Sequence, residues 1–232
     1  MPVHVFPVES VPSSILGGDS IENVYMMVRT YLSQRSQSGD TVDRHMACGS
    51  RRDVEVAIEE FLSWSRAKPN EDPKVLWLSL HGVPPKTPAD VGTSAMSAAH
   101  YASASDEFEI VEWAPAFATL RGACAPGVVI LSDVCWGASP TAPARLTSKI
   151  GSNPALFFGP VRKSHRLELD TAAGIVFGAL ARGSVPTVDE AQRIVLHLNA
   201  SFPRDAKNDK PFYRVWWWAD DRNLECYPRA RC

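Results

Sequence analysis

A thiol and an imidazole each follow a strongly apolar stretch of this chain. Cys135 comes shortly after Val128–Leu131, a run of four branched or long apolar residues, and His81 directly follows Lys74–Leu80. Short continuous apolar runs of this kind are typical of strands that are buried on both faces of a parallel sheet. Because neighbouring parallel strands end at the same edge, we expect His81 and Cys135 to meet where open α/β sheets gather their functional groups.

The chemistry that these two groups can perform together is nucleophilic attack assisted by proton transfer. A cysteine attacks as its thiolate, and a histidine exchanges protons near neutral pH. Taken alone, each is more often a structural residue, since cysteine is among the most frequently buried residue types. The combination is more informative, because Gly82 and Gly137 follow the two residues closely and let a substrate approach the backbone. The hypothesis that follows is a Cys–His catalytic site.

The surrounding sequence alternates between strand-like and helix-like segments, which indicates an α/β fold. The other expected strands are Val3–Val8, Val42–Cys48, Phe108–Trp113, Pro154–Gly159 and Phe212–Trp218; the expected helices are Ser20 to about Gln34, Arg52–Arg66, Leu167–Arg182 and Val188–Ala200, the last capped by Thr187. We predict one domain over residues 1–232. Its architecture is expected to be a three-layer α/β sandwich with a mostly parallel central sheet of about six strands.

Two segments each allow two interpretations. Val83–Ser105 is rich in Ser, Ala, Pro, Thr and Gly, and is either a loop that faces a substrate or a plain surface excursion. Within it, Ser94–Ala104 is compatible with a helix. The aromatic run Trp216–Trp218 lies in the strand expected to close the sheet, and burial statistics favour core packing over a stacking platform.

Composition and charge argue against several classes of function. The 232 residues are 45% hydrophobic and carry 24 basic against 26 acidic side chains. The chain therefore lacks the strong positive charge that would favour binding of nucleic acid. The short basic clusters, Arg162-Lys163 with Arg166 and Arg229 with Arg231, are assigned to solvated loops. No apolar run reaches membrane-spanning length, and the pattern of a signal peptide is missing. Five irregularly spaced cysteines without a Cys-x-x-Cys pair favour a reducing cytoplasm and predict no disulfide framework, metal site or cofactor.

The ordered set of motifs resembles the caspase-like cysteine peptidases, which include caspases, metacaspases, paracaspases, legumains, separases and bacterial CHAT proteins. Cys135 lies 54 positions after His81, and the caspase signature likewise places its His about 50 residues before a Gln-Ala-Cys-x-Gly motif. This chain matches the glycine two positions after the cysteine. It departs before the cysteine, where it has Ser132-Asp133-Val134. The later stretch Pro154–Arg182 is similar to CHAT proteins in particular.

The resemblance implies a role for each residue of the site. Cys135 would attack the scissile carbonyl, with His81 as general base and then as general acid. The backbone N–H groups of Gly82 and Cys135 would stabilise the oxyanion. Family members often hold the two side chains apart in the free enzyme and generally work as a dyad. The likeness to bacterial members also implies a protein or peptide substrate, an activating protein partner, and regulated proteolysis in defence or cell death.

The carboxylate at position 133 leads to a prediction about which substrate side chain the site prefers. In metacaspases and paracaspases, an Asp two residues before the cysteine lines the pocket that receives a basic side chain. Because side chains alternate along a strand, positions 133 and 135 are expected on the same side, where a carboxylate would pair with Arg or Lys. The alternative is that Asp133 only caps the turn after the strand.

Functions of other classes stay open. A caspase-like fold can serve as a catalytically silent docking or regulatory module, although this chain retains both His81 and Cys135. A flavodoxin-like ligand-binding domain is a third interpretation, against which the lack of a Gly-x-Gly-x-x-Gly motif and of a Walker loop argues. Family members are often matured by cleavage after the cysteine strand. The segment Ala138–Ser152 carries Arg145 and Lys149, which predicts self-cleavage after one of them.

Overall fold

The fold is an α/β arrangement of ten strands and three helices within the described part of the chain. The computed structural model describes residues 2–10, 41–42, 46–83, 95–99, 108–112, 124–138, 155–180, 182, 184–202, 211–218 and 224–229. The elements are β1 (His4–Ser10), β2 (Thr41–Val42), β3 (Met46–Ala47), α3 (Arg51–Arg66), β4 (Lys74–Val83), β5 (Ala95–Ala99), β6 (Phe108–Glu112), β7 (Val128–Ser132), β8 (Leu156–Pro160), α5 (Arg166–Leu180), α6 (Val188–Ser201), β9 (Tyr213–Trp218) and β10 (Leu224–Tyr227). The helix expected from Ser20 to Gln34 lies outside the described residues.

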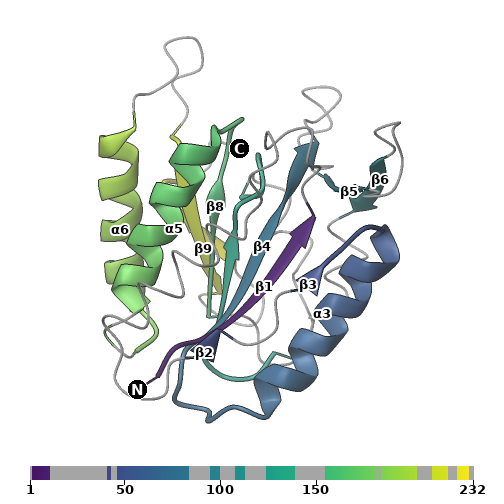
Figure 1. Ribbon diagram of the computed structural model, residues 1–232. Helices are drawn as coiled ribbons and strands as arrows, with labels where there is room; N and C mark the ends of the chain where they lie inside the picture. Colours follow the sequence, from purple (N-terminus) through teal and green to yellow (C-terminus); the bar gives the residue numbers. More distant parts are fainter. Residues whose placement is uncertain are drawn as a thin grey trace.

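The central sheet has the strand order β10-β9-β8-β7-β4-β1-β2 (Figure 1). Strands β1, β4, β7 and β8 pair in parallel with one another along this order, whereas β9 is antiparallel to β8 and β10 is antiparallel to β9. The α/β class predicted from the sequence is therefore confirmed, and the sheet is mixed. The strands that precede His81 and Cys135 are direct neighbours, since β4 pairs with β7 from Lys74–Val128 to Leu78–Ser132.

Successive residues of the central strands enter two different cores. One core takes every second strand residue together with the apolar stripe of α3, and the other takes the alternate residues together with α5 and α6. Figure 1 shows α3 on one side of the sheet and α5 and α6 on the other. The α3 core includes Phe6, Leu76, Ile130, Ile58 and Phe61, and the α5–α6 core includes Val75, Trp77, Val129, Phe177 and Val195. Because both faces are covered, the central strands are apolar at most positions on both faces.

Local capping fixes where two of the helices begin. Ser50 accepts a hydrogen bond from the Asp53 backbone N–H at 3.2 Å at the start of α3. Thr187 and Glu190 form a reciprocal capping box at the start of α6, as the sequence predicted for Thr187. Side-chain oxygens in these positions satisfy backbone donors that a helix leaves free at its first turn.

Three expectations from the sequence are wrong. Strand β4 does not stop before His81 but continues to Val83, because its end pairs with β5. The stretch compatible with a helix contains β5, an extended segment paired with both β4 and β6. Strand β9 does not close the sheet, since β10 adds a further edge strand to it. Core packing was expected for Trp216–Trp218. Trp216 and Trp217 are indeed buried in the core.

The helices that the structure describes include none long and apolar enough to cross a lipid bilayer.

Candidate active site

Cys135 lies in a tight turn that follows β7. The strand ends at Ser132, and the backbone N–H of Asp133 still donates to the Leu78 carbonyl of β4 at 2.7 Å. The chain then turns, with Gly137 N–H donating to the Val134 carbonyl at 2.8 Å and Trp136 in the left-handed region at φ 60°. Two sets of hydrogen bonds therefore hold the thiol at the carboxyl end of the sheet: one to the neighbouring strand β4, and one within the turn itself.

Gly82 of β4 packs directly against Cys135. A Cβ atom placed on Gly82 would lie 2.7 Å from the Cys135 Cβ and nearer still to the Cys135 carbonyl oxygen. Such distances are below any van der Waals contact, so residue 82 must be glycine for the strand and the turn to touch. His81 precedes Gly82 on the same strand. The residue as a whole is exposed, although its ring is partly enclosed, and strand alternation directs its side chain to the face opposite the Gly82 Cβ position. The structure thus brings the strand segment that carries the imidazole into contact with the turn that carries the thiol.

The Cys135 thiol is half-buried and is held by the backbone of Ser164. The Ser164 N–H donates to Cys135 Sγ at 3.4 Å, and Sγ lies 3.6 Å from the Ser164 carbonyl oxygen. Burial raises the pKa of Cys135, while the Ser164 N–H and the charge of Lys163 act in the opposite direction. A backbone N–H that points at sulfur stabilises the thiolate rather than the thiol. The resting group is therefore a thiol with part of its anion-stabilising environment already in place.

His81 is poised as a neutral base. Partial burial lowers the pKa of its ring, and the nearby charge of Lys163 lowers that pKa further. A neutral imidazole can accept a proton from a thiol, whereas an imidazolium cannot. Because the charge of Lys163 acts on both His81 and Cys135, the three side chains share one electrostatic neighbourhood.

The segment that contains Lys163 and Ser164 is a part of the site that the sequence analysis assigned to a solvated loop. It is tied to the rest of the site at several points: Trp136 N–H donates to the Arg162 carbonyl at 3.2 Å, and Arg162 forms an ion pair with Glu168 at 2.9 Å. The second Glu168 oxygen accepts the His165 N–H at 2.9 Å at the start of α5. The only sequence signal was a basic cluster directly after a buried strand.

Asp133 is not beside the thiol in the way that the sequence suggested. The alternation on which that prediction rested requires a strand through position 135, and β7 ends at Ser132. The Asp133 side chain is 2% exposed and accepts a hydrogen bond from Trp77 Nε1 at 2.5 Å. Its negative charge also contributes, after burial, to raising the pKa of Tyr213. The carboxylate is therefore directed into the protein rather than toward an incoming side chain.

The other thiols in the described part of the chain differ from Cys135. Cys48 and Cys124 are buried, and burial raises the pKa of each to about 12. Cys226 is half-buried, with its sulfur 3.5 Å from the Pro228 carbonyl oxygen. All four are free thiols. Among the residues that the structure describes, no three His, Cys, Asp or Glu side chains come together as a metal site would require.

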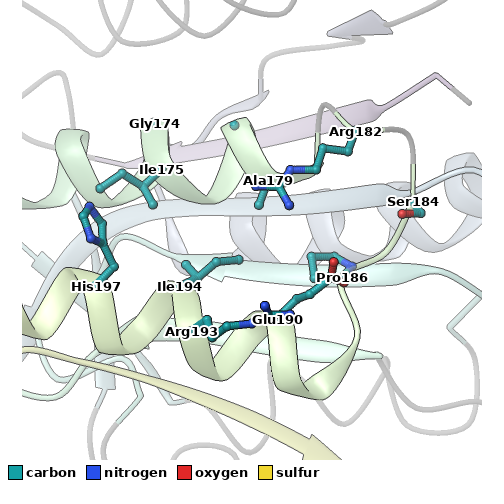
Figure 2. A pocket seen from close by; sticks show the side chains of 11 residues that line it. Gly174, Ile175, Ala179, Arg182, Ser184, Pro186, Glu190, Arg193, Ile194 and His197 are labelled. Carbon is teal, nitrogen blue, oxygen red and sulfur yellow. The ribbon is translucent and has the colours of Figure 1, made fainter.

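A groove of about 550 Å³ lies elsewhere, between α5 and α6, and its lining includes neither His81 nor Cys135 (Figure 2). We base the candidate active site on the contacts of the thiol instead. Residues 84–94, which follow β4 in the sequence, and residues 139–154, which follow the Cys135 turn and include Arg145 and Lys149, lie outside the described residues.

The comparisons with known proteins place the chain in no family. No family model and no curated protein matches the sequence. Among solved structures, protein GSU0716 from Geobacter sulfurreducens is similar over 88% of this chain and 90% of its own, with a TM-score of 0.47 and 14% sequence identity. A likeness of this extent assigns neither a family nor an activity.

Proposed function

We propose that this protein is a cysteine endopeptidase in which Cys135 is the nucleophile and His81 transfers the proton. The observation that carries the proposal is the contact between Gly82 and Cys135, which joins the imidazole-bearing strand to the thiol-bearing turn at the carboxyl end of the sheet. The second support is the Ser164 N–H on the sulfur. A thiol whose sulfur accepts from a backbone N–H, with an imidazole on the neighbouring strand segment, has the types of group that acyl transfer uses.

The reaction follows from these groups. His81 accepts the thiol proton as Cys135 Sγ bonds to the carbonyl carbon of the peptide, and the backbone N–H groups of Gly82 and Cys135 receive the oxyanion. The C–N bond then breaks, with the proton passing from His81 to the leaving amine. A water molecule attacks the resulting thioester while His81 takes its proton, and release of the acid restores the thiol.

The same proposal extends to the architecture. Helices on both faces of a sheet with parallel central strands support a three-layer sandwich of the caspase-like type, with residues 1–232 as one peptidase domain. A protein or peptide substrate, an activating partner and a cytoplasmic location belong to this proposal. Cleavage after Arg or Lys remains a prediction from the resemblance, and the buried Asp133 lends it no support.

A second candidate is a catalytically silent docking or regulatory module. The observation in its favour is that burial raises the pKa of Cys135 and lowers that of His81, so both groups are uncharged at neutral pH in this conformation. An enzyme can show the same resting state if substrate or an activating partner completes the site. Activity measurements separate the two candidates.

The test is a peptide-library cleavage assay on the full chain. Cys135→Ala should abolish cleavage and His81→Ala should lower it by about 10²–10⁴-fold, since that is the usual contribution of proton transfer. Cys226→Ala and His197→Ala are the matched controls and should retain activity, since His197 lies on α6 in the groove that includes neither His81 nor Cys135. Cleavage that survives Cys135→Ala contradicts the proposal. Lack of cleavage by the wild type, combined with no selective alkylation of Cys135, favours the silent module.

A further inference from the structure

The groove between α5 and α6 has properties that the packing of the fold does not require. Gly174 and Gly178 of α5 line it together with Ala179, so small residues occur at helical spacing along one wall. A Cβ added to Gly174 would meet no atom within 4 Å. Glycine within a helix is less favourable than alanine. The fold thus carries an unfavourable residue at a position where a larger one would fit, and the result is a deeper groove.

The charges around the groove are unbalanced. Arg182 and Arg193 contribute two guanidinium groups, and Glu190 is the one acidic side chain among the described residues of the lining. One carboxylate oxygen of Glu190 is engaged by Thr187, which donates from its backbone N–H at 2.9 Å and from its hydroxyl at 3.1 Å. The capping bonds from Thr187 lower the pKa of Glu190 first, and the charges of Arg193 and Arg182 lower it further.

The two guanidinium groups therefore act on the same small region. Figure 2 shows Arg182 on the α5 side of the groove, with Glu190 and Arg193 on the α6 side and His197 nearer the other end. Within the described part of the chain, neither Arg182 nor Arg193 forms an ion pair with a carboxylate. A pair of arginines without carboxylate partners can bind a phosphate or carboxylate with directed hydrogen bonds.

The dimensions favour a small molecule over a polypeptide. The α6 wall from Glu190 to His197 is about 10 Å long at 1.5 Å per residue, which is the length of only about three extended peptide residues. The volume of about 550 Å³ lies within the usual range of small-molecule sites, about 300–1,000 Å³. Ile175 and Ile194 provide apolar contact area in the same groove.

We propose that the α5–α6 groove is a binding site for a small organic anion. A phosphate or carboxylate head is held by Arg182 and Arg193, and an apolar body lies over Ile175 and Ile194. This site is separate from the thiol and imidazole, and the inference does not depend on the peptidase proposal.

Calorimetric titration of the full chain at low salt tests the proposal with three probes: phenyl phosphate, phenylacetate and the neutral benzyl alcohol. At least one anion should bind saturably, at least tenfold more tightly than benzyl alcohol. Tighter binding of phenyl phosphate identifies a phosphate ligand, and tighter binding of phenylacetate a carboxylate. Arg182→Gln and Arg193→Gln should each weaken binding at least fivefold. The control Arg52→Gln, on α3, should leave it unchanged.

Two more variants complete the test. Gly174→Leu should fill the groove and abolish binding without lowering the melting temperature, because the position is open. Cys135→Ala should bind as the wild type does, so that failure of the peptidase proposal leaves this one standing. The proposal is overturned by equal affinity for benzyl alcohol, by no saturable binding of either anion, or by arginine variants that bind normally. It is also overturned if Gly174→Leu dissociates a dimer, because the occupant is then a second copy of the chain.

Discussion

Cys135 stands apart from the other described thiols because its sulfur is near both a backbone donor and a positive charge. Its pKa is raised by burial, yet the Ser164 N–H and Lys163 act against that increase. Cys48 and Cys124 are more fully buried, and burial raises the pKa of each to about 12, although the charge of Arg66 acts against the increase at Cys124. Because the thiolate is the reacting form, this difference predicts that Cys135 is modified faster than Cys48 or Cys124.

Lys163→Met should raise the pKa of Cys135 and also that of His81, since the lysine charge lowers both. The pH midpoint for alkylation of Cys135 by iodoacetamide should move upward, and the rate at neutral pH should fall roughly two- to fivefold, as expected for loss of one exposed charge. The rate can be followed by mass spectrometry of the Cys135 peptide. Lys68→Met, just after the end of α3, is the control. An equal change in both variants would contradict a specific role for Lys163.

At the scale of elements, the site depends on how far β4 extends. Its last residues pair with β5 rather than leading into a loop, which carries His81 and Gly82 along the sheet as far as the Cys135 turn. The Arg162–Glu168 ion pair and the Glu168 bond to the His165 N–H then connect the Ser164 segment to the first turn of α5. The surroundings of the Cys135 sulfur therefore come from three parts of the chain: the end of β4, the turn after β7, and the segment before α5.

Two glycine substitutions should have opposite effects on stability. Gly82→Ala introduces a Cβ into atoms of Cys135 and should lower the free energy of unfolding by about 1–3 kcal/mol, as overpacking does. Gly174→Ala adds a Cβ in open space on α5 and should raise the free energy of unfolding by roughly 0.5–1 kcal/mol. Urea denaturation measures both. If Gly82→Ala proves neutral, the close packing of β4 on Cys135 does not exist in solution.

At the scale of the whole molecule, the two ends of the sheet are built differently. At the amino end of the parallel strands, the buried Lys74 ammonium donates to the carbonyls of Asn70, Asp72 and Pro126 at 3.3, 2.9 and 2.8 Å. These bonds connect the start of β4 to the chain just before β7. The carboxyl end of the same two strands carries His81 and Cys135. At the end opposite the site, these bonds therefore hold the two strands together.

Stability should fall in alkaline solution because of the two buried thiols. The pKa values of Cys48 and Cys124 are about 12 in the folded protein and about 8.5 in an unfolded chain. Between these pH values the folded state binds more protons than the unfolded state, so the free energy of unfolding decreases as pH rises. The loss at pH 10 should be roughly 1–2 kcal/mol for each thiol.

Urea denaturation at pH 8 and pH 10 measures this dependence. The double variant Cys48→Ala, Cys124→Ala should be less stable at pH 8, because cavities replace the two side chains, but should lose less stability on going to pH 10. Cys226→Ala is the control and should keep the pH dependence of the wild type. An unchanged pH dependence in the double variant would mean that these thiols ionise as freely in the folded protein as in the unfolded one.

Features that depend on neighbouring residues could be predicted from the sequence. Val128–Leu131 is apolar at every position, and Lys74–Leu80 is apolar except at Lys74 and Ser79. Helices cover both faces of the sheet, and burial of that kind is visible in composition alone. The cap at Thr187 depends on Glu190, three residues away, and was equally predictable. His81 and Cys135 were also chosen as candidates from the sequence, because apolar runs show where the strands end and these two residues follow those ends.

Other features were decided only by contacts between distant segments. The small residues of Ala95–Ala99 have no strong preference for a strand, and β5 forms because β4 and β6 offer it partners. Asp133 turns inward because the Trp77 indole, 56 positions earlier in the chain, bonds its carboxylate. The Ser164 N–H reaches Cys135 from 29 positions away. The sequence by itself determined which residues could perform the chemistry, whereas the tertiary structure decided which groups surround them, because long-range register leaves no local pattern.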